Sequence, residues 1–335
     1  MGKEWFLYVV TDIGVHRLKL DIRKLRNGNR IPKLNQRPPV EFEDLELLSP
    51  DGKFPYYTQH IIVGSQVYLV GGYYSNDEPN ISDAYAINPN TTCVTSAAFP
   101  YDYPDLLSAL SKSSATLFQV GSSFYILDAS QGITFYVLEP KGTDGCTKRI
   151  LPNPPVSRVS NHTSWGHKIH ITTLGIPFTS RGASYTFDLC KEKWDKWPDQ
   201  FRAAVEYKGF FIGLLPTGLL VCSRMDSNGN PERPLKVLHD LFDIFNLKGP
   251  YFLELDQVFM GLFDDGEDNF IWLVNSFEGV EADLHCHMPF LLFRVFIEND
   301  PDDNSVLSAV LEAAEYYDFF EDNVFCTAFA CANIN

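Results

Sequence analysis

The side chains best suited to chemistry in this sequence are histidines in two short clusters. One cluster lies within residues 161–170, and the other is His285-Cys286-His287. Because imidazole titrates near neutral pH, His162, His285 and His287 are candidate residues for proton transfer. The alternative interpretation is that they are hydrogen-bonded loop histidines with no catalytic role.

Metal binding is a second chemistry that histidines could support. A His-x-His pair on a strand places both rings on one face, but a zinc site needs further ligands that this sequence does not specify. The seven cysteines form no Cys-x-x-Cys pair, which favours small buried side chains over a zinc knuckle. Phosphate-binding, dinucleotide-binding, nucleophile-elbow and zinc-protease motifs are also absent from the sequence. The sequence therefore predicts no metal and no cofactor.

A second set of candidate residues is aromatic and lies in segments between the expected strands. Three of these segments contain Pro-Tyr, and another pair of tyrosines follows Gly71-Gly72. Tyrosines present flat, amphipathic surfaces that suit a peptide or an aromatic ligand. The alternative is that they pack neighbouring structural units together. The candidate ligand-binding residues are Tyr56, Tyr57, Tyr73, Tyr74, Tyr101, Tyr103 and Tyr251.

Composition and charge narrow the classes of partner. The chain has 335 residues, of which 45% are hydrophobic, with 27 Lys+Arg against 43 Asp+Glu and a formal net charge of −16. Such an acidic protein is repelled by phosphate backbones and anionic lipid, so we expect neither nucleic acid nor a membrane surface as a partner. The first apolar run, Phe6 to Val10, is too short for a signal sequence or a membrane span. We therefore expect a cytoplasmic protein.

An internal repeat organises the chain. Its unit is an apolar strand, a tight turn and a second apolar strand that carries an aromatic residue, and six copies can be traced. Their spacing is near the roughly 40–50 residues of four-stranded propeller blades. The second strands of the copies are anchored on Tyr8, Tyr68, Tyr125, His170, Phe211 and Ile271.

A third apolar strand follows each second strand. Two later segments, 231–247 and 305–319, also carry helical i, i+3, i+4 spacing, and the sequence leaves them open between strand and helix. The expected third strands are Val15–Leu20, Ala84–Asn88, Thr134–Leu138, Ser184–Asp188, Leu219–Ser223 and Phe290–Phe296.

The N-terminal copy lacks a first strand, and the two ends of the chain offer a solution. The apolar run Val324 to Phe329 has no partner of its own, so we expect it to pair with the N-terminal strand. Closing the ring in this way removes unpaired strand edges. The sequence thus predicts one all-β domain over residues 1–335, a six-bladed propeller closed by the C-terminal strand.

Two segments resemble kelch repeats. Val67 to Gly72 followed by Asp83 to Thr91 has the order strand, Gly-Gly, loop, aromatic strand and Asn-Pro-x-Thr turn, and Ser184 to Trp194 resembles a second half with Trp194 in the tryptophan position of the family. The remaining copies lack the glycine pair. The chain is thus similar to a divergent kelch-repeat protein, of the kind found in plants but without the F-box domain that many of those carry.

The kelch resemblance implies an interaction module. The leading hypothesis is that the face with the long loops presents its tyrosines to a protein partner, and the acidic surface favours a basic one. The competing hypothesis is a cofactor-free enzyme, an isomerase, lyase or cyclase, that acts on a small aromatic or cationic metabolite at the channel mouth and uses tyrosine for cation–π contacts.

Overall fold

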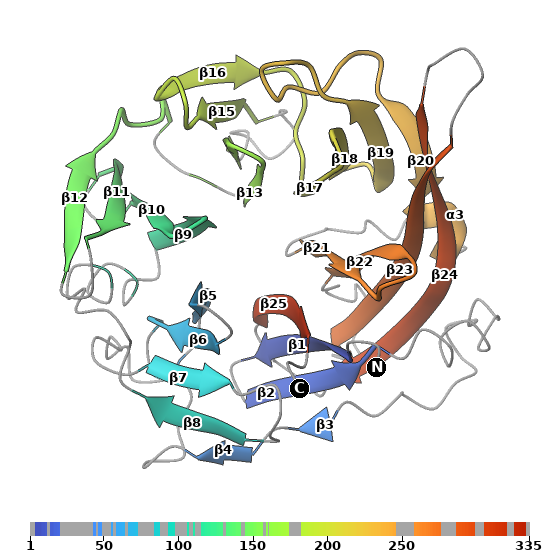
Figure 1. Ribbon diagram of the computed structural model, residues 1–335, viewed down its shortest axis with the longest axis horizontal. Helices are drawn as coiled ribbons and strands as arrows, with labels where there is room; N and C mark the ends of the chain where they lie inside the picture. Colours follow the sequence, from blue (N-terminus) through green and yellow to red (C-terminus); the bar gives the residue numbers. More distant parts are fainter. Residues whose placement is uncertain are drawn as a thin grey trace.

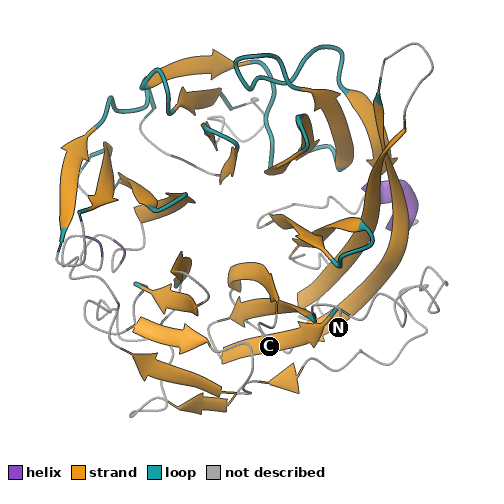
Figure 2. Ribbon diagram, in the orientation of Figure 1, coloured by secondary structure: helices purple, strands orange, loops and turns teal. Residues whose placement is uncertain are grey.

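A computed structural model of the protein shows a single ring of small β-sheets, and the described residues form many strands and one short helix, α3 (Figure 1 and Figure 2). The structure describes residues 4–11, 14–20, 43–44, 46–48, 55, 58–63, 66–72, 84–87, 93–97, 106, 110, 115–129, 132–141, 145–156, 159, 161–173, 182–245, 258–275, 286–298, 305–319 and 325–332. Within these residues the strands gather into small, mostly antiparallel sheets that stand side by side around a common axis, which is the arrangement of a β-propeller (Figure 1).

Four sheets are four-stranded meanders, each built from one continuous stretch of chain. The first is β9 (Ala115–Val120), β10 (Ser123–Asp128), β11 (Thr134–Pro140) and β12 (Cys146–Ile150). The second is β13 (Asn161–Trp165), β14 (Lys168–Thr172), β15 (Ser184–Asp188) and β16 (Lys193–Trp197). The third is β17 (Ala203–Tyr207), β18 (Phe210–Leu214), β19 (Leu219–Arg224) and β20 (Lys236–Asp240). The fourth is β21 (Val258–Asp264), β22 (Asn269–Asn275), β23 (Cys286–Glu298) and β24 (Val306–Phe319).

The other sheets depart from this pattern. A five-stranded sheet has the order β4-β8-β7-β6-β5 and contains β4 (Glu46–Leu48), β5 (Gln59–Val63), β6 (Gln66–Val70), β7 (Ala84–Ile87) and β8 (Cys93–Ala97), with β4 parallel to β8. The terminal sheet is centred on a hairpin of β1 (Trp5–Thr11) and β2 (Gly14–Lys19), flanked by β25 (Phe325–Ala332) and by the two-residue β3 (Glu43–Asp44).

The expectation of a six-bladed kelch-like propeller is therefore wrong: the described sheets form five blades and a terminal hairpin sheet. In the described part of the chain, five sheets are contiguous or nearly contiguous units, whereas the N-terminal segment contributes only the two long strands of the β1–β2 hairpin. The physical reason lies in how the next described strands, β3 and β4, pair. The chain provides two residues in β3 and then gives β4 to the neighbouring sheet, where β4 pairs in parallel with β8.

The pairing between the two ends of the chain is present. β25 runs antiparallel to β1, with Phe6 opposite Cys331, Tyr8 opposite Phe329 and Val10 opposite Thr327. The side chains of Leu7, Tyr8 and Val9 on β1 are fully buried. The C-terminal strand thus covers an edge that would otherwise expose unpaired backbone groups.

The hydrophobic core lies between neighbouring sheets. β14 and β18, the second strands of their sheets, are buried at every position, as expected for strands covered on both faces. One core cluster joins Ile212 of β18 to Ile271 and Phe293 of the following sheet. These two sheets are therefore stabilised by packing against each other.

The two segments for which the sequence does not decide between strand and helix, 231–247 and 305–319, differ in the structure. Lys236–Asp240 forms strand β20 and Leu241–Phe245 forms the short helix α3. β24, from Val306 to Phe319, is a strand along its whole length and pairs with β23. Pairing with a long partner strand outweighs the weak helical periodicity of this sequence.

Polar side chains also join neighbouring sheets at their inner strands. The amide of Gln59 on β5 donates from Nε2 to the Ala115 carbonyl and accepts at Oε1 from the Leu117 N–H, both at 2.8 Å. Gln119 on β9 bonds across the same two sheets from the other side. Its Nε2 donates to the Ile62 carbonyl, and its Oε1 accepts from the Ile62 N–H. These side chains satisfy backbone groups that no adjacent strand reaches.

Candidate functional site

Most of the residues that the sequence singled out lie outside the described residues. This holds for all seven candidate tyrosines, Tyr56, Tyr57, Tyr73, Tyr74, Tyr101, Tyr103 and Tyr251, and for His285. His287 lies in β23 opposite Asp318, and its side chain is outside the described set. The aromatic surface therefore stays a prediction from the sequence.

His162 is the candidate proton-transfer residue that the structure does describe. It lies on the inner strand β13 opposite Ile171, and its ring meets Phe118 of the preceding sheet edge-on, with the centroids 5.1 Å apart. The ring keeps solvent contact, but the protein packed around it lowers the pKa of His162 from 6.5 to about 4 by desolvation. At neutral pH this imidazole is uncharged.

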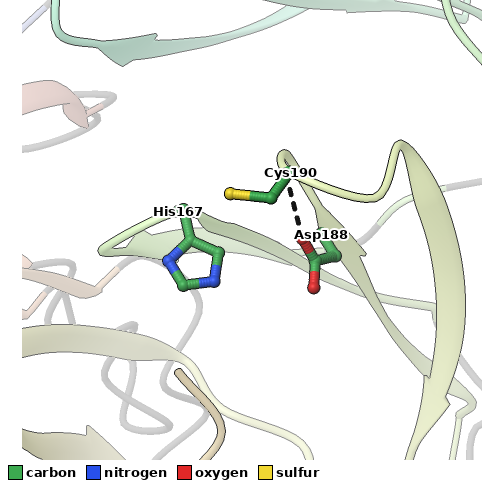
Figure 3. Close-up of side chains that lie close together, drawn as sticks. All are labelled: His167, Asp188 and Cys190. Carbon is green, nitrogen blue, oxygen red and sulfur yellow. Dashed lines mark hydrogen bonds between the residues drawn. The ribbon is translucent and has the colours of Figure 1, made fainter. Parts of the chain in front are cut away.

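A different group of chemically capable side chains meets at the ends of two hairpins of one sheet (Figure 3). His167 lies in the β13–β14 turn, Asp188 ends β15, and Cys190 lies in the β15–β16 turn. Their possible ligand atoms, an imidazole nitrogen, a carboxylate oxygen and Sγ, all lie within 4.8 Å of one another. We refer to these three residues as the turn cluster.

Strand register brings the cluster together. Lys168 of β14 is opposite Asp188 of β15, and the Leu189 N–H donates to the His167 carbonyl at 3.0 Å. In an antiparallel meander the first–second and third–fourth turns lie at the same end of the sheet. The turn cluster thus lies on the hairpin-turn face, opposite the long-loop face on which the sequence placed function.

Asp188 is the electrostatic centre of the cluster. Its carboxylate is buried, and Oδ2 accepts a 2.6 Å hydrogen bond from the equally buried Lys168 Nζ. Oδ1 accepts from the N–H groups of Cys190 at 2.9 Å and Lys191 at 3.0 Å. Burial alone would raise the pKa of Asp188, but these donors lower it from 3.8 to about 2. The carboxylate is therefore ionised and held in place at physiological pH.

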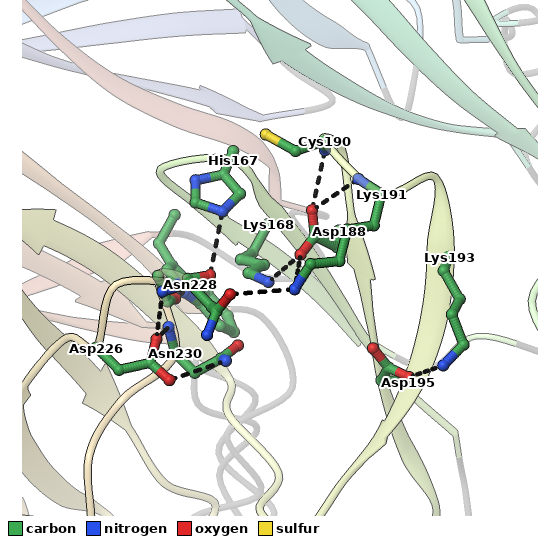
Figure 4. A network of polar contacts seen from close by, with 12 residues as sticks. His167, Lys168, Asp188, Cys190, Lys191, Lys193, Asp195, Asp226, Asn228 and Asn230 are labelled. Atoms are coloured by element: carbon green, nitrogen blue, oxygen red, sulfur yellow. Dashed lines mark hydrogen bonds and ion pairs between the residues drawn. The ribbon is translucent and has the colours of Figure 1, made fainter.

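A turn from the next sheet packs against the cluster (Figure 4). The Asn228 carbonyl lies 3.1 Å from His167 Nε2. Because a carbonyl can only accept, Nε2 carries the proton and donates. Lys191 Nζ donates to Asn228 Oδ1 at 3.3 Å, and the Trp165 indole N–H donates to the Gly229 carbonyl at 3.3 Å. Three side chains of one sheet thereby hold one turn of its neighbour.

Local sequence explains the shape of this neighbouring turn. Asp226 Oδ1 accepts from the N–H groups of Asn228 at 2.8 Å and Asn230 at 2.9 Å, which outweighs the effect of burial and lowers the pKa of Asp226. Gly229 has φ +70°, and a Cβ there would lie 2.6 Å from Cε1 of His167. Only glycine combines this backbone conformation with such a close approach to the ring.

The hydrogen bonds of the turn cluster distinguish between the kinds of chemistry that its side chains could support. A Cys-His nucleophile needs a hydrogen bond between the thiol and the imidazole, and a proton relay needs one between the imidazole and the carboxylate. Among the described contacts, no hydrogen bond joins the side chains of His167, Asp188 and Cys190 to one another. The separations instead fit groups that converge on a common point.

Sequence reasoning named the histidine-containing segment 161–170 but missed Asp188, Cys190 and Asn228 in this role. The available signal was the antiparallel register of the repeat, which pairs the turn after Trp165 with the turn after Asp188. The contribution of Asn228 from another sheet has no local signal, because it depends on how neighbouring sheets stack.

Comparisons with known proteins give little further guidance. No protein-family model matches the chain, and no curated protein matches it. Among solved structures, the chain is similar to the computationally designed Ika8 protein in its first P63 crystal packing, with 8% identity, a TM-score of 0.34, and coverage of 93% of this chain and 79% of that one. A likeness this weak carries no argument about function. Among the described helices, none has the length and apolar character needed to span a bilayer.

Proposed function

We propose that this protein is a kelch-type interaction module that binds a protein partner through its long-loop face. The β-propeller fold is common among proteins that mediate protein interactions, and it holds loops from several sheets on a rigid scaffold. The observation that carries the kelch assignment is the backbone at the glycine pair after β6.

Gly71 and Gly72 have φ values of +73° and +82°. The Gly72 N–H donates to the Leu110 carbonyl at 2.9 Å, and a Cβ on Gly71 would lie 2.4 Å from the same carbonyl oxygen. The pair is therefore required both for its conformation and for the close approach of residue 110. This is the physical role expected of a kelch Gly-Gly.

Trp194 supports the same assignment. It lies on the outer strand β16, and its ring packs at 5.0 Å from Phe187 in its own sheet and 5.4 Å from Phe135 in the preceding sheet. Its indole N–H donates to the Pro152 carbonyl at 2.7 Å. The tryptophan thus joins consecutive sheets, which explains why a repeat of this kind would keep a large aromatic residue at this place.

Charge and location define the partner that we propose. A net charge of −16 favours a basic partner in the cytoplasm, because complementary potentials speed association and disfavour acidic competitors. The candidate contact residues remain Tyr56, Tyr57, Tyr73, Tyr74, Tyr101, Tyr103 and Tyr251. Nucleic acid and membranes are not the proposed partners.

The experiment is selection of binders from a displayed random peptide library against the folded full chain, followed by affinity measurements on synthetic peptides. We expect selected peptides to be basic, to bind more weakly as salt rises, and to lose affinity when Tyr57, Tyr101 and Tyr251 are changed to Ala together. Lys191→Ala on the hairpin-turn face is the matched control and should leave binding unchanged.

Three results would contradict the proposed interaction function. Binders without basic character, or binding that the triple tyrosine variant retains, would overturn the proposal. So would a small metabolite that raises the melting temperature of the protein and is consumed by it, because this would favour the cofactor-free enzyme and make His162, His285 and His287 the first positions to change.

A further inference from the structure

We propose that the turn cluster of His167, Asp188 and Cys190 binds a divalent transition-metal ion of the zinc type on the hairpin-turn face. This inference is independent of the proposed interaction function, which concerns the opposite face. It rests on the donor types, their separations and the contacts that hold them.

The donor set selects the class of metal. Thiolate, imidazole and carboxylate together match the ligands of Zn²⁺, whereas Ca²⁺ and Mg²⁺ take oxygen ligands only. Three protein ligands leave a fourth position for water or for a further group, as in zinc sites that remain open. The half-buried His167 and the exposed Cys190 leave the cluster accessible to an ion from solvent.

The separations fit an ion between the three groups. At tetrahedral angles, metal bonds of about 2.0–2.3 Å place two ligands of one zinc ion about 3.3–3.8 Å apart. The three ligand atoms are within 4.8 Å of one another, so side-chain rotations that bring them about 1 Å closer place them in range. Side chains that were already hydrogen-bonded to one another would have no room for an ion, and these three are not so bonded among the described contacts.

The ion pair of Asp188 with Lys168 leaves a place for the metal. Each carboxylate oxygen accepts about two hydrogen bonds. Among the described residues, Oδ1 accepts two from backbone N–H groups, and Oδ2 accepts one, from Lys168. Lys191 Nζ lies 3.5 Å from Oδ2 and donates to Asn228 instead. One lone pair of Oδ2 is therefore available for a bond to metal.

Hydrogen bonds from neighbouring groups hold the candidate ligands in place, as outer-shell residues do in known metal sites. The Asn228 carbonyl orients the imidazole of His167, and the N–H of Cys190 itself fixes the carboxylate of Asp188. The buried Lys168 offsets the negative charge of the Asp188 carboxylate before metal arrives. The site is thus largely formed by the fold, although its residues come from separate turns.

The test is titration of the chelator-treated full chain with Co²⁺, a spectroscopic substitute for Zn²⁺, followed by displacement with Zn²⁺. We expect one equivalent to give a thiolate-to-cobalt charge-transfer band in the near ultraviolet that Zn²⁺ abolishes. Cys190→Ser and His167→Gln should weaken binding by at least about 100-fold, beyond the roughly 10–100-fold cost of losing an outer-shell contact. Cys93→Ser, on β8 in another sheet, is the control that should retain the band.

Two results would overturn the proposal. One is a folded protein that shows no thiolate band at saturating Co²⁺. The other is a band of unchanged intensity and affinity in Cys190→Ser, which would place the metal at another cysteine. Circular dichroism and melting of each variant establish that it is folded, and Asp188→Asn serves as a second ligand variant that keeps the backbone contacts of residue 188.

Discussion

At the scale of single residues, buried ionisable groups decide how this protein responds to pH. His170 on β14 is fully buried between the rings of Trp165 and Phe201, and its Nδ1 lies 3.1 Å from the Thr186 hydroxyl. In the described part of the chain, its Nε2 has no hydrogen-bond partner. Desolvation lowers the pKa of His170 from 6.5 to about 3, and His60 is shifted in the same direction.

The first prediction is a loss of stability in mild acid that depends on His170. Between pH 6.5 and about 3 the unfolded chain binds a proton that the folded chain does not, so the free energy of unfolding falls as pH falls, by up to about 1.4 kcal/mol per pH unit. When urea unfolding is measured at several pH values, the free energy of unfolding of His170→Phe should change less steeply with pH than that of the wild type, by about that amount. Thr186→Val, which keeps the histidine, should retain the slope, and parallel curves for His170→Phe and the wild type would contradict the prediction.

The second prediction concerns the buried ion pair of the turn cluster. Lys168→Met leaves the Asp188 carboxylate buried without its nearest cation, which should lower the free energy of unfolding by about 3 kcal/mol, at the low end of the usual range because Lys191 is close. The double variant Lys168→Met/Asp188→Asn removes the charge and keeps an oxygen for the backbone N–H groups. It should recover much of the loss in chemical denaturation, and equal instability of single and double variants would show that the charge is not the cause.

At the scale of elements, the turns between strands contribute both to the packing of neighbouring sheets and to the candidate metal site.

The third prediction separates two effects of glycine in the β17–β20 sheet. Gly209 (φ +80°) has open space where a Cβ would lie, whereas a Cβ on Gly229 (φ +70°) would meet the His167 ring. Both Ala variants should lose about 1 kcal/mol from backbone strain, and Gly229→Ala should lose more and also bind Co²⁺ more weakly. Equal losses, measured by thermal and urea unfolding, would mean that the approach to His167 is unimportant.

The strand hairpins could be predicted because their signal is local. Apolar runs on either side of a tight turn, such as Val120-Gly121-Ser122-Ser123, predict β9 and β10, and the structure pairs them in that register. The apolar run at the C-terminus predicts its own pairing with β1, because nothing nearby in sequence could cover it. These features follow from hydrophobic patterning and from the cost of unpaired edges.

The turn cluster and the irregular sheets could not be predicted in the same way. β4 joins β8 in parallel across many intervening residues, and Asn228 reaches His167 from another sheet. Both depend on contacts between units that are distant in sequence and similar in local pattern. The strand state of β24 was also hidden, because its helical spacing is overridden by pairing with β23.

At the scale of the whole molecule, the structure closes on itself through the terminal sheet. The fourth prediction is that deletion of residues 324–335 sharply lowers the melting temperature and promotes aggregation, because it exposes the edge of β1 and uncovers its buried side chains. Scanning calorimetry and light scattering measure the two effects. A deletion variant that melts at the temperature of the full chain would show that closure does not stabilise the ring.

The two ends of the sheets thus have separate proposed roles: the long-loop face binds a protein, and the hairpin-turn face binds a metal ion. Hydrogen–deuterium exchange of the full chain with and without a selected basic peptide tests whether the long-loop face is the interaction surface. We expect slower exchange in segments 54–57, 73–83, 99–103 and 249–252, which contain the candidate tyrosines, and unchanged exchange in the turns at His167, Cys190 and Asn228. Protection confined to those turns would contradict this proposal.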